Sequence, residues 1–238
     1  MDYFYTPPSL IRNTSLVIQG DELHHLSKVL RKKVGETIIV VDGKEHAYRA
    51  VLESISKSSA DCRILETFHR FNEPDIEVRL AVALLKNPSR LDFLVEKCSE
   101  LGVREFIPMK TDRTIVSKVH AERLQKLALS AMTQCGRSFL PPIRDLTDFQ
   151  GVLESLQSCE RKLIMHERAD AGAKPREKIE AGNSVKSVGI LIGPEGGFTD
   201  GEVEAAQSAG FVQVSFGTRR LRSETAAIVS VSAIILDR

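Results

Sequence analysis

Two glycine-rich stretches near the C-terminal end could build a binding site from main-chain atoms. The first is LIGPEGGF at 191–198, and the second is FGTRRLRSET at 216–225. Each begins at the end of an apolar run that is typical of a buried strand. Glycine allows the backbone to turn sharply and allows a ligand to approach peptide groups that a Cβ atom would shield. One such loop would indicate an ordinary strand-to-helix turn, whereas two in succession favour a binding site.

The spacing of these glycines argues against the two common phosphate-binding loops. No Gly-Lys-Ser/Thr follows them, as a Walker A loop requires, and the G-x-G-x-x-G spacing is absent. A third stretch, LIMHER at 163–168, also lies at the end of an apolar run. In open α/β sheets, ligands bind beyond the carboxyl ends of the strands. We therefore expect the three loops to hold a ligand chiefly through backbone and apolar contacts.

From residue 73 onward, apolar runs alternate with amphipathic stretches. The predicted strands are VRLAVALL, REFIPM, RKLIMH, SVGILIG and FVQVSFG, and the predicted helices are SRLDFLVEKCSELGV, AERLQKLALSAMTQC, GEVEAAQSA and SETAAIVSVSAIIL. Thr199 and Glu202 form a T-x-x-E capping box for the third of these helices. Segment 167–183 reads as a polar surface connection. Strands that alternate with helices imply a mostly parallel sheet with helices on both faces.

Residues 1–72 read as a small β-rich domain. The Asp-Gly pair at 42–43 separates ETIIVV from a strand-like AYRAVLESI, which predicts a hairpin, and ADCRILETF predicts a further strand. RFNEPD at 70–75 is a polar break that contains proline. The sequence therefore predicts two domains, 1–72 and 73–238.

A basic turn ends the helix that is predicted within the first domain. The segment GDELHHLSKVLRKKVGE has helical periodicity, and Asp21 could cap its start. Its apolar face consists of Leu23, Leu26, Val29 and Leu30. Its polar side chains are His24, His25, Lys28, Arg31, Lys32 and Lys33. Cations are favourable at a helix C-terminus whether or not anything binds there, so RNA contact and a solvated surface both stay open for this turn.

Bulk composition neither requires nor excludes a nucleic-acid partner. Lys and Arg total 33 against 32 Asp and Glu, so any RNA binding must rest on local clusters. No apolar run approaches the roughly 20 residues that cross a bilayer, and the N-terminus has no secretion signal. We expect a soluble cytoplasmic protein. Cys62, Cys98, Cys135 and Cys159 show no metal-ligand spacing, so we expect buried, reduced thiols and no metal.

Four stretches, spread in order along the chain, resemble those of one known family. They are GDELHHLSKVLRKKVGE, KNPSRLDFLVEKCSELGV, TQCGRSFLPPI and the C-terminal run LIGPEGGFTDGEVEAA…GF…VSFGTRRLRSETAA. Together they resemble the RsmE family of 16S rRNA uracil-N3 methyltransferases, within the SPOUT superfamily. The chain departs from the family pattern at Asp2, Thr133, Thr218 and Arg220.

This resemblance implies a fold, a reaction and a set of ligands. The fold would be α/β, with an N-terminal PUA-like β-barrel and a C-terminal SPOUT-type parallel-sheet methyltransferase domain whose last segment forms a trefoil knot. The three loops would bind S-adenosylmethionine, and the protein would act as a homodimer on 16S rRNA or on the assembled small ribosomal subunit. By position, the cofactor-binding residues would be Met165, Ile192, Gly193, Gly197, Phe216, Gly217, Leu221 and Arg222.

Methyl transfer to uracil requires that N3 lose its proton and lie in line with the leaving sulfur. A carboxylate, or a water that it orients, could accept the proton, and a cation beside O2 or O4 would stabilise the anionic base. Residues suited to these catalytic roles are Arg222, Glu224, Glu195 and Arg137. Structural alternatives exist, because an acid such as Glu224 is favourable in the first turn of any helix and Glu195 could simply shape its loop.

Contacts to RNA phosphates would come from arginine and lysine side chains. The candidates are Lys28, Arg31, Lys32, Lys33, Arg90, Arg219 and Arg220. N3 lies on the Watson–Crick edge, so the target base must be unpaired or flipped out. Two alternatives stay open. One is another SPOUT RNA methyltransferase, such as a ribose 2′-O-methyltransferase, and the other is a non-catalytic RNA-binding assembly factor.

Overall fold

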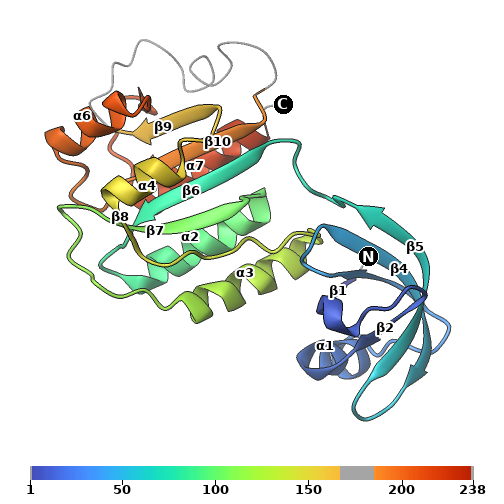
Figure 1. The fold of residues 1–238 in the computed structure, drawn as a ribbon. Coiled ribbons are helices and arrows are strands. Elements are labelled where there is room, and N and C mark those ends of the chain that lie inside the picture. Colours follow the sequence, from blue (N-terminus) through green and yellow to red (C-terminus); the bar gives the residue numbers. More distant parts are fainter. Residues whose placement is uncertain (1, 167–184, 237–238) are drawn as a thin grey trace. The chain divides into compact units, whose positions relative to one another are not determined.

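The computed structural model describes residues 2–166 and 185–236, and the chain divides into two compact units (Figure 1). The first unit contains Met1–Glu73 and Leu129–Leu140, and the second contains Pro74–Ala128 and Pro141–Arg238. The surface connection predicted at 167–183 lies outside the described residues.

A five-stranded sheet forms the first unit, which agrees with the predicted β-rich character of this part of the chain. The strand order is β1-β3-β4-β5-β2, and every pair is antiparallel except β1 with β3. The strands, with one 3-10 helix, are β1 (Tyr3–Tyr5), η1 (Pro8–Leu10), β2 (Ser15–Ile18), β3 (Thr37–Val41), β4 (His46–Ile55) and β5 (Ala60–His69). The predicted hairpin joins β3 to β4. The buried Asp42 carboxylate stabilises its turn by accepting hydrogen bonds from the backbone N–H groups of Lys44 (2.7 Å) and His46 (3.1 Å).

The predicted N-terminal helix is shorter and less regular than its periodicity indicates. An α-helical turn, α1 (Gly20–His24), continues directly into a π-helical turn, η2 (His25–Val29). Leu26 is fully buried, as expected, but Val29 is 57% exposed, because a π turn moves side chains off the register of an α-helical face. The prediction that Asp21 caps this helix is wrong. The helix begins one residue before it, so Asp21 lies inside the first turn, where its charge still complements the helix dipole.

The second unit is built on a six-stranded sheet in which all neighbouring strands are parallel. Its strand order is β11-β9-β10-β6-β7-β8. The strands are β6 (Glu77–Ala83), β7 (Glu105–Lys110), β8 (Thr147–Asp148), β9 (Arg161–Met165), β10 (Ser187–Ile192) and β11 (Val212–Val214). The predicted parallel sheet is therefore confirmed. The central strands β6 and β10 are the most continuously apolar, because both of their faces are covered.

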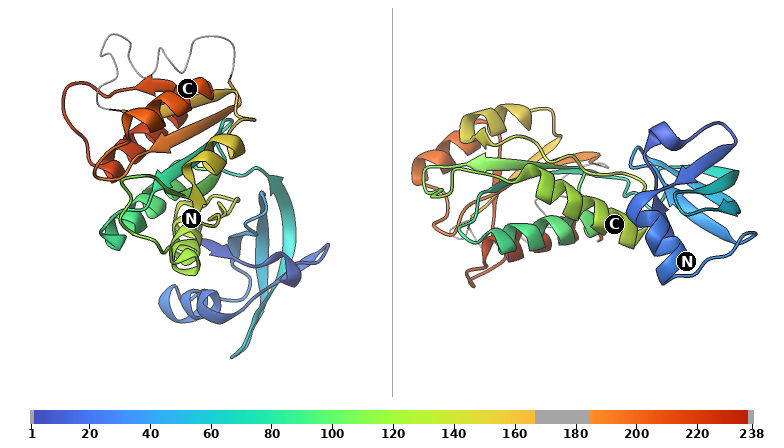
Figure 2. Two further views of the ribbon diagram at one scale, coloured as in Figure 1. Left: turned by 60° about the vertical axis from the view of Figure 1, so that its left-hand side comes forward. Right: turned by 90° about the horizontal axis from the view of Figure 1, so that it is seen from below.

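Helices cover both faces of this sheet. They are α2 (Pro88–Leu101), α3 (Ala121–Cys135), α4 (Phe149–Ser155), α6 (Asp200–Ser208) and α7 (Ser223–Ile235). Helices α2 and α7 pack side by side on one face, and α4 and α6 lie on the other (Figure 2). The short helix α4 was not predicted. Among the described residues, no helix is both long enough and apolar enough to cross a membrane.

The predicted capping box at the start of α6 is confirmed. The Thr199 hydroxyl accepts a hydrogen bond from the Glu202 N–H (3.2 Å), and the Glu202 carboxylate accepts one from the Thr199 N–H (2.8 Å). This reciprocal pair satisfies two of the N–H groups that every helix start leaves without an intrahelical partner. The start of α6, directly after the first glycine-rich loop, is therefore well defined.

All four cysteines are free thiols, as expected, and three of them are buried. Burial raises the pKa of the Cys62 thiol to about 12, and burial also raises the pKa of Cys98 and of Cys159. The prediction that all four thiols are buried is wrong for Cys135, which lies at the end of α3 and is partly exposed. The thiolate is the reactive form of cysteine, so a raised pKa together with burial makes a thiol unreactive.

We expect iodoacetamide to alkylate Cys135 and to spare the other three cysteines in the native protein at about pH 8, because at that pH the buried thiols stay protonated. Mass spectrometry of the digested protein would locate the label. In denaturant all four cysteines should react equally. Labelling of Cys98 in the native protein at the rate of Cys135 would contradict the expected burial.

Candidate active site

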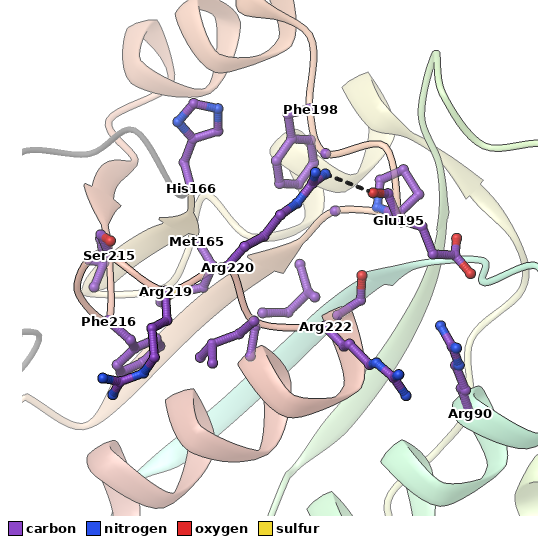
Figure 3. Close-up of a pocket in the computed structure, with 18 residues that line it drawn as sticks. Arg90, Met165, His166, Glu195, Phe198, Ser215, Phe216, Arg219, Arg220 and Arg222 are labelled. Carbon is purple, nitrogen blue, oxygen red and sulfur yellow. Dashed lines mark hydrogen bonds between the residues drawn. The ribbon is translucent and has the colours of Figure 1, made fainter.

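A pocket of about 310 Å³ lies where the carboxyl ends of β9, β10 and β11 meet the start of α7 (Figure 3). All three loops that the sequence analysis singles out contribute to its wall. The parallel pairing explains this convergence, because neighbouring parallel strands end at the same edge of a sheet. The pocket therefore occupies the position at which ligands bind in open α/β folds.

Most of the predicted cofactor-binding residues line this pocket. Seven of the eight do so: Met165, Ile192, Gly193, Gly197, Phe216, Leu221 and Arg222. The eighth, Gly217, follows Phe216 in the chain but does not line the wall. The loops thus bring together residues that lie more than fifty positions apart in the sequence.

Several lining residues were missed in the sequence analysis. They are His166, Pro194, Phe198, Val214, Ser215, Ser223 and Ala226. Most are chain neighbours of predicted residues, so adjacency was the signal that could have found them. His166 differs from the others because its Nδ1 atom is buried and has no hydrogen-bond partner among the described residues. A buried polar atom of this kind favours a ligand that can form a hydrogen bond with it.

Four charged side chains lie on one side of the pocket, and a fifth, Arg219, lies apart from them beside Phe216 (Figure 3). The four are Arg90, Glu195, Arg220 and Arg222, which all line the pocket. Arg220 Nη2 donates a hydrogen bond to the main-chain oxygen of Glu195 (3.0 Å), which joins the two glycine-rich loops. The Glu195 carboxylate accepts a hydrogen bond from the Lys86 N–H (3.0 Å). These contacts fix the position of a carboxylate among several arginines.

Glu224 lies beside the pocket but is not part of its wall. It is buried in the first turn of α7, and its Oε1 atom lies 3.7 Å from Arg90 Nε. Arg90 does line the pocket. The structure therefore shows Glu224 in contact with a pocket arginine, and its predicted catalytic role stays a prediction.

Comparison with known proteins identifies the family of this chain. A profile of the RNA methyltransferase domain matches residues 72–235, and a profile of the RNA methyltransferase PUA domain matches residues 18–65. The ribosomal RNA small subunit methyltransferase E of Bacillus subtilis (strain 168) is 31% identical over 91% of this chain and 88% of the relative. The chain belongs to the ribosomal RNA small subunit methyltransferase E family.

Two further E-family members extend this similarity. The protein from Synechocystis sp. (strain ATCC 27184 / PCC 6803 / Kazusa) is 31% identical over 95% of this chain and 75% of the relative. The crystal structure of the E-family methyltransferase from Neisseria gonorrhoeae, bound to S-adenosyl methionine, is 31% identical and has a TM-score of 0.83. That comparison covers 98% of this chain and 96% of the other.

In this E-family chain, the predicted catalytic Arg137 belongs to the first unit, whereas the pocket belongs to the second. Arg137 is 3% exposed, and its Nε and Nη2 atoms donate hydrogen bonds to Glu73 Oε2 (3.2 and 2.7 Å). The other Glu73 oxygen accepts hydrogen bonds from the N–H groups of Ser138 and Phe139 (both 2.9 Å). These contacts give Arg137 a structural role, and its predicted part in catalysis stays a prediction.

The predicted RNA-binding turn of the first unit has three exposed cationic side chains and one lysine that forms ion pairs within the protein. Lys28, Arg31 and Lys33 are exposed. Lys32 instead forms ion pairs with Asp2 (3.0 Å) and Glu36 (3.3 Å), and the hydrogen bond to Asp2 is the main reason that the pKa of Lys32 is raised. Asp2 is one of the positions that the sequence analysis expects to depart from the family pattern, and in the structure its carboxylate pairs with Lys32.

We expect Arg137→Ala to lower the free energy of unfolding by about 3–5 kcal/mol, because it leaves the buried Glu73 carboxylate without its counter-ion. Denaturant unfolding would measure the change. Arg63→Ala is the matched control, since Arg63 pairs with Glu53 on the exposed surface of the same unit, and it should cost less than about 1 kcal/mol. Equal effects of the two substitutions would contradict the structural role of Arg137.

Proposed function

We propose that this chain transfers a methyl group from S-adenosylmethionine to N3 of a uracil in 16S rRNA. The observation that carries this proposal is the pocket at the ends of β9, β10 and β11, which seven of the eight expected cofactor residues line. Family membership supports it, because the curated relatives are named as small subunit rRNA methyltransferases and the Neisseria gonorrhoeae protein binds S-adenosyl methionine.

The chemistry of the pocket fits this methyl donor. Bound there, S-adenosylmethionine would supply a methyl group made electrophilic by a sulfonium. Met165, Ile192 and Leu221 offer an apolar surface to an adenosyl group, and the Nδ1 atom of His166, which has no partner within residues 2–166 and 185–236, offers a hydrogen bond. Arginine and glutamate side chains on the charged side of the pocket match the carboxylate and ammonium groups of an amino acid.

The position of each charged side chain relative to the pocket suggests its role in methyl transfer or RNA binding. Glu195 lines the pocket and could accept the N3 proton directly or orient a water that does so. Arg222 also lines the pocket and could stabilise the negative charge that develops on the uracil. Glu224 would act through Arg90, which it contacts. Arg219 and Arg220 are exposed and are placed to meet RNA phosphates.

We further propose the domain organisation that the sequence predicts, with a PUA-like RNA-binding domain at 1–72 and a SPOUT methyltransferase domain at 73–238. The PUA profile match and the five-stranded sheet support the first, and Lys28, Arg31 and Lys33 would contact RNA. A trefoil knot formed by the last segment of the chain is part of this proposal, as is a cytoplasmic location, where 16S rRNA is available.

A homodimer completes the proposal. The exposed apolar side chains Phe93 on α2 and Val229 on α7 support it, because these two helices pack side by side and present an outer surface that a second subunit could cover. RNA methylation would then depend on residues of both copies.

Phe93→Glu should convert the dimer to a monomer, because it buries a charge in the proposed interface. Light scattering coupled to size exclusion would show the molar mass fall about twofold. Leu65→Glu is a matched control, since Leu65 is equally exposed but lies on β5 of the first unit. A wild-type protein that is monomeric at the concentration used in the assay would contradict the dimer.

The reaction itself can be tested with ribosomal subunits from a strain that lacks the gene. Nucleoside mass spectrometry should find no 3-methyluridine in its small-subunit rRNA, and incubation with the purified protein and S-adenosylmethionine should restore it. A methyl group that appears on a ribose 2′-oxygen would indicate a different RNA methyltransferase. Unchanged 3-methyluridine in the strain, with no methyl transfer by the protein, would indicate a non-catalytic assembly factor.

Substitution of the two carboxylates would separate their roles. Glu195→Gln should lower kcat by about 100-fold or more, as expected for loss of a proton acceptor, while the affinity for S-adenosylhomocysteine stays similar. Glu224→Gln should have a smaller effect, about tenfold, because it acts through Arg90. Steady-state assays at saturating substrate concentrations would measure both kcat values. Glu204→Gln, on the exposed face of α6, is the control, and full activity of Glu195→Gln would exclude Glu195 as the proton acceptor.

A further inference from the structure

The turn that follows β7 holds the first glycine-rich loop from outside the pocket. Arg113 Nη1 donates hydrogen bonds to two main-chain oxygens of that loop, those of Gly196 (2.7 Å) and Phe198 (3.1 Å). The two carbonyls flank Gly197, which lines the pocket. Phe198 lines the pocket as well (Figure 3). Arg113 itself does not line the pocket. Its guanidinium therefore contacts the loop and not the cavity.

The glycine at position 196 leaves room for this contact. A Cβ atom there would lie 3.3 Å from Arg113 Cδ and 3.4 Å from Arg113 Cβ. The first distance is shorter than an ordinary van der Waals contact and the second is at its lower limit, so the stem of Arg113 packs directly against the glycine. The backbone at Gly196 is outside the left-handed region. A larger residue could therefore adopt this backbone conformation, but its side chain would crowd Arg113.

The turn that carries Arg113 is itself held in place. The Thr114 hydroxyl accepts a hydrogen bond from the Thr111 N–H (3.0 Å), and the Thr114 N–H donates to the Thr111 main-chain oxygen (3.0 Å). The Asp112 N–H donates to Glu202 Oε1 (2.9 Å). Glu202 is buried, and its other oxygen completes the capping box of α6. The turn is thus fastened to the helix that directly follows the glycine-rich loop.

We propose that Arg113 is a positioning residue for the methyl donor, which it serves by holding Gly196–Phe198 in the conformation that forms the pocket wall. This inference rests on the proposed function. Hydrogen bonds from a guanidinium are charge-assisted and hence stronger than those between neutral groups. Without that donor, two neighbouring carbonyl oxygens would converge with no positive charge between them, and the loop would open. The wall formed by Gly193, Glu195 and Phe198 would lose its shape.

The test compares variants by their affinity for S-adenosylhomocysteine, measured by calorimetry, and by the KM values for S-adenosylmethionine and for ribosomal subunits. Arg113→Ala should raise the Kd for S-adenosylhomocysteine and the KM for S-adenosylmethionine at least about tenfold, and leave the KM for subunits within about twofold. Arg113→Lys keeps the charge and should recover part of the affinity. Arg144→Ala is the matched control, because Arg144 pairs with Glu105 on the surface of the same unit, and it should change none of the three constants.

A second pair of variants tests the coupling between Arg113 and the loop. Gly196→Ala should weaken binding in the wild-type background, where it displaces the arginine stem, and should add nothing to Arg113→Ala. If Arg113→Ala fails to fold, Arg113→Lys and Gly196→Ala still test the inference, because both variants retain the positive charge at position 113. Normal affinity of a folded Arg113→Ala, or effects of the two substitutions that multiply, would overturn the inference while leaving the proposed function intact. A wild-type protein that binds no S-adenosylhomocysteine would instead contradict the proposed function, and with it this inference.

Discussion

Parallel pairing of β9 with β10 and with β11 is the constraint on which the site depends. Because the three strands run in one direction, the loops after them leave the sheet at a common edge, and a pocket forms from segments that are distant in the sequence. Continuous apolar runs make this pairing stable, since strands covered by helices on both faces must be apolar throughout. The position of the pocket is therefore a consequence of how the core is buried.

Loops rich in glycine are poor at holding a shape by themselves, because glycine restricts the backbone least. In this protein, side chains outside the cavity supply the missing restraint. Arg113 binds two carbonyls of the first loop, Arg220 binds a third, and Glu202 joins the turn after β7 to the start of α6. The pocket wall can therefore consist of main-chain atoms and small residues, which leave space for a bound ligand. The contacts from outside the cavity still hold this wall in one conformation.

In the first unit, the Gly-Arg pair at 136–137, which contains a predicted catalytic residue, makes structural contacts. Gly136 and Arg137 follow α3, and the guanidinium of Arg137 is buried against Glu73. A buried charge is tolerated when its partner and hydrogen bonds are present and is costly when they are removed. Glu73 meets this condition because its second oxygen accepts two backbone N–H groups. A Gly-Arg pair in a sequence cannot distinguish this use from a role in chemistry, since both require a fixed guanidinium.

Local patterns in the sequence predicted the hairpin at Asp42–Gly43, the parallel sheet and the capping box of α6, because each depends on the periodicity or type of neighbouring residues. The resemblance to a known family, and not periodicity, predicted the seven cofactor residues that line the pocket. The π turn at His25–Val29 and the short α4 were missed, because backbone irregularity and brief helices depend on what packs against them. Tertiary structure alone decided the partners of charged side chains. Arg137 pairs with Glu73, and Glu224 pairs with Arg90. Arg113 donates hydrogen bonds to the carbonyls of Gly196 and Phe198. The physical reason is that an ion pair or hydrogen bond depends on a distance of a few ångströms between atoms that the sequence separates by 64 to 134 residues.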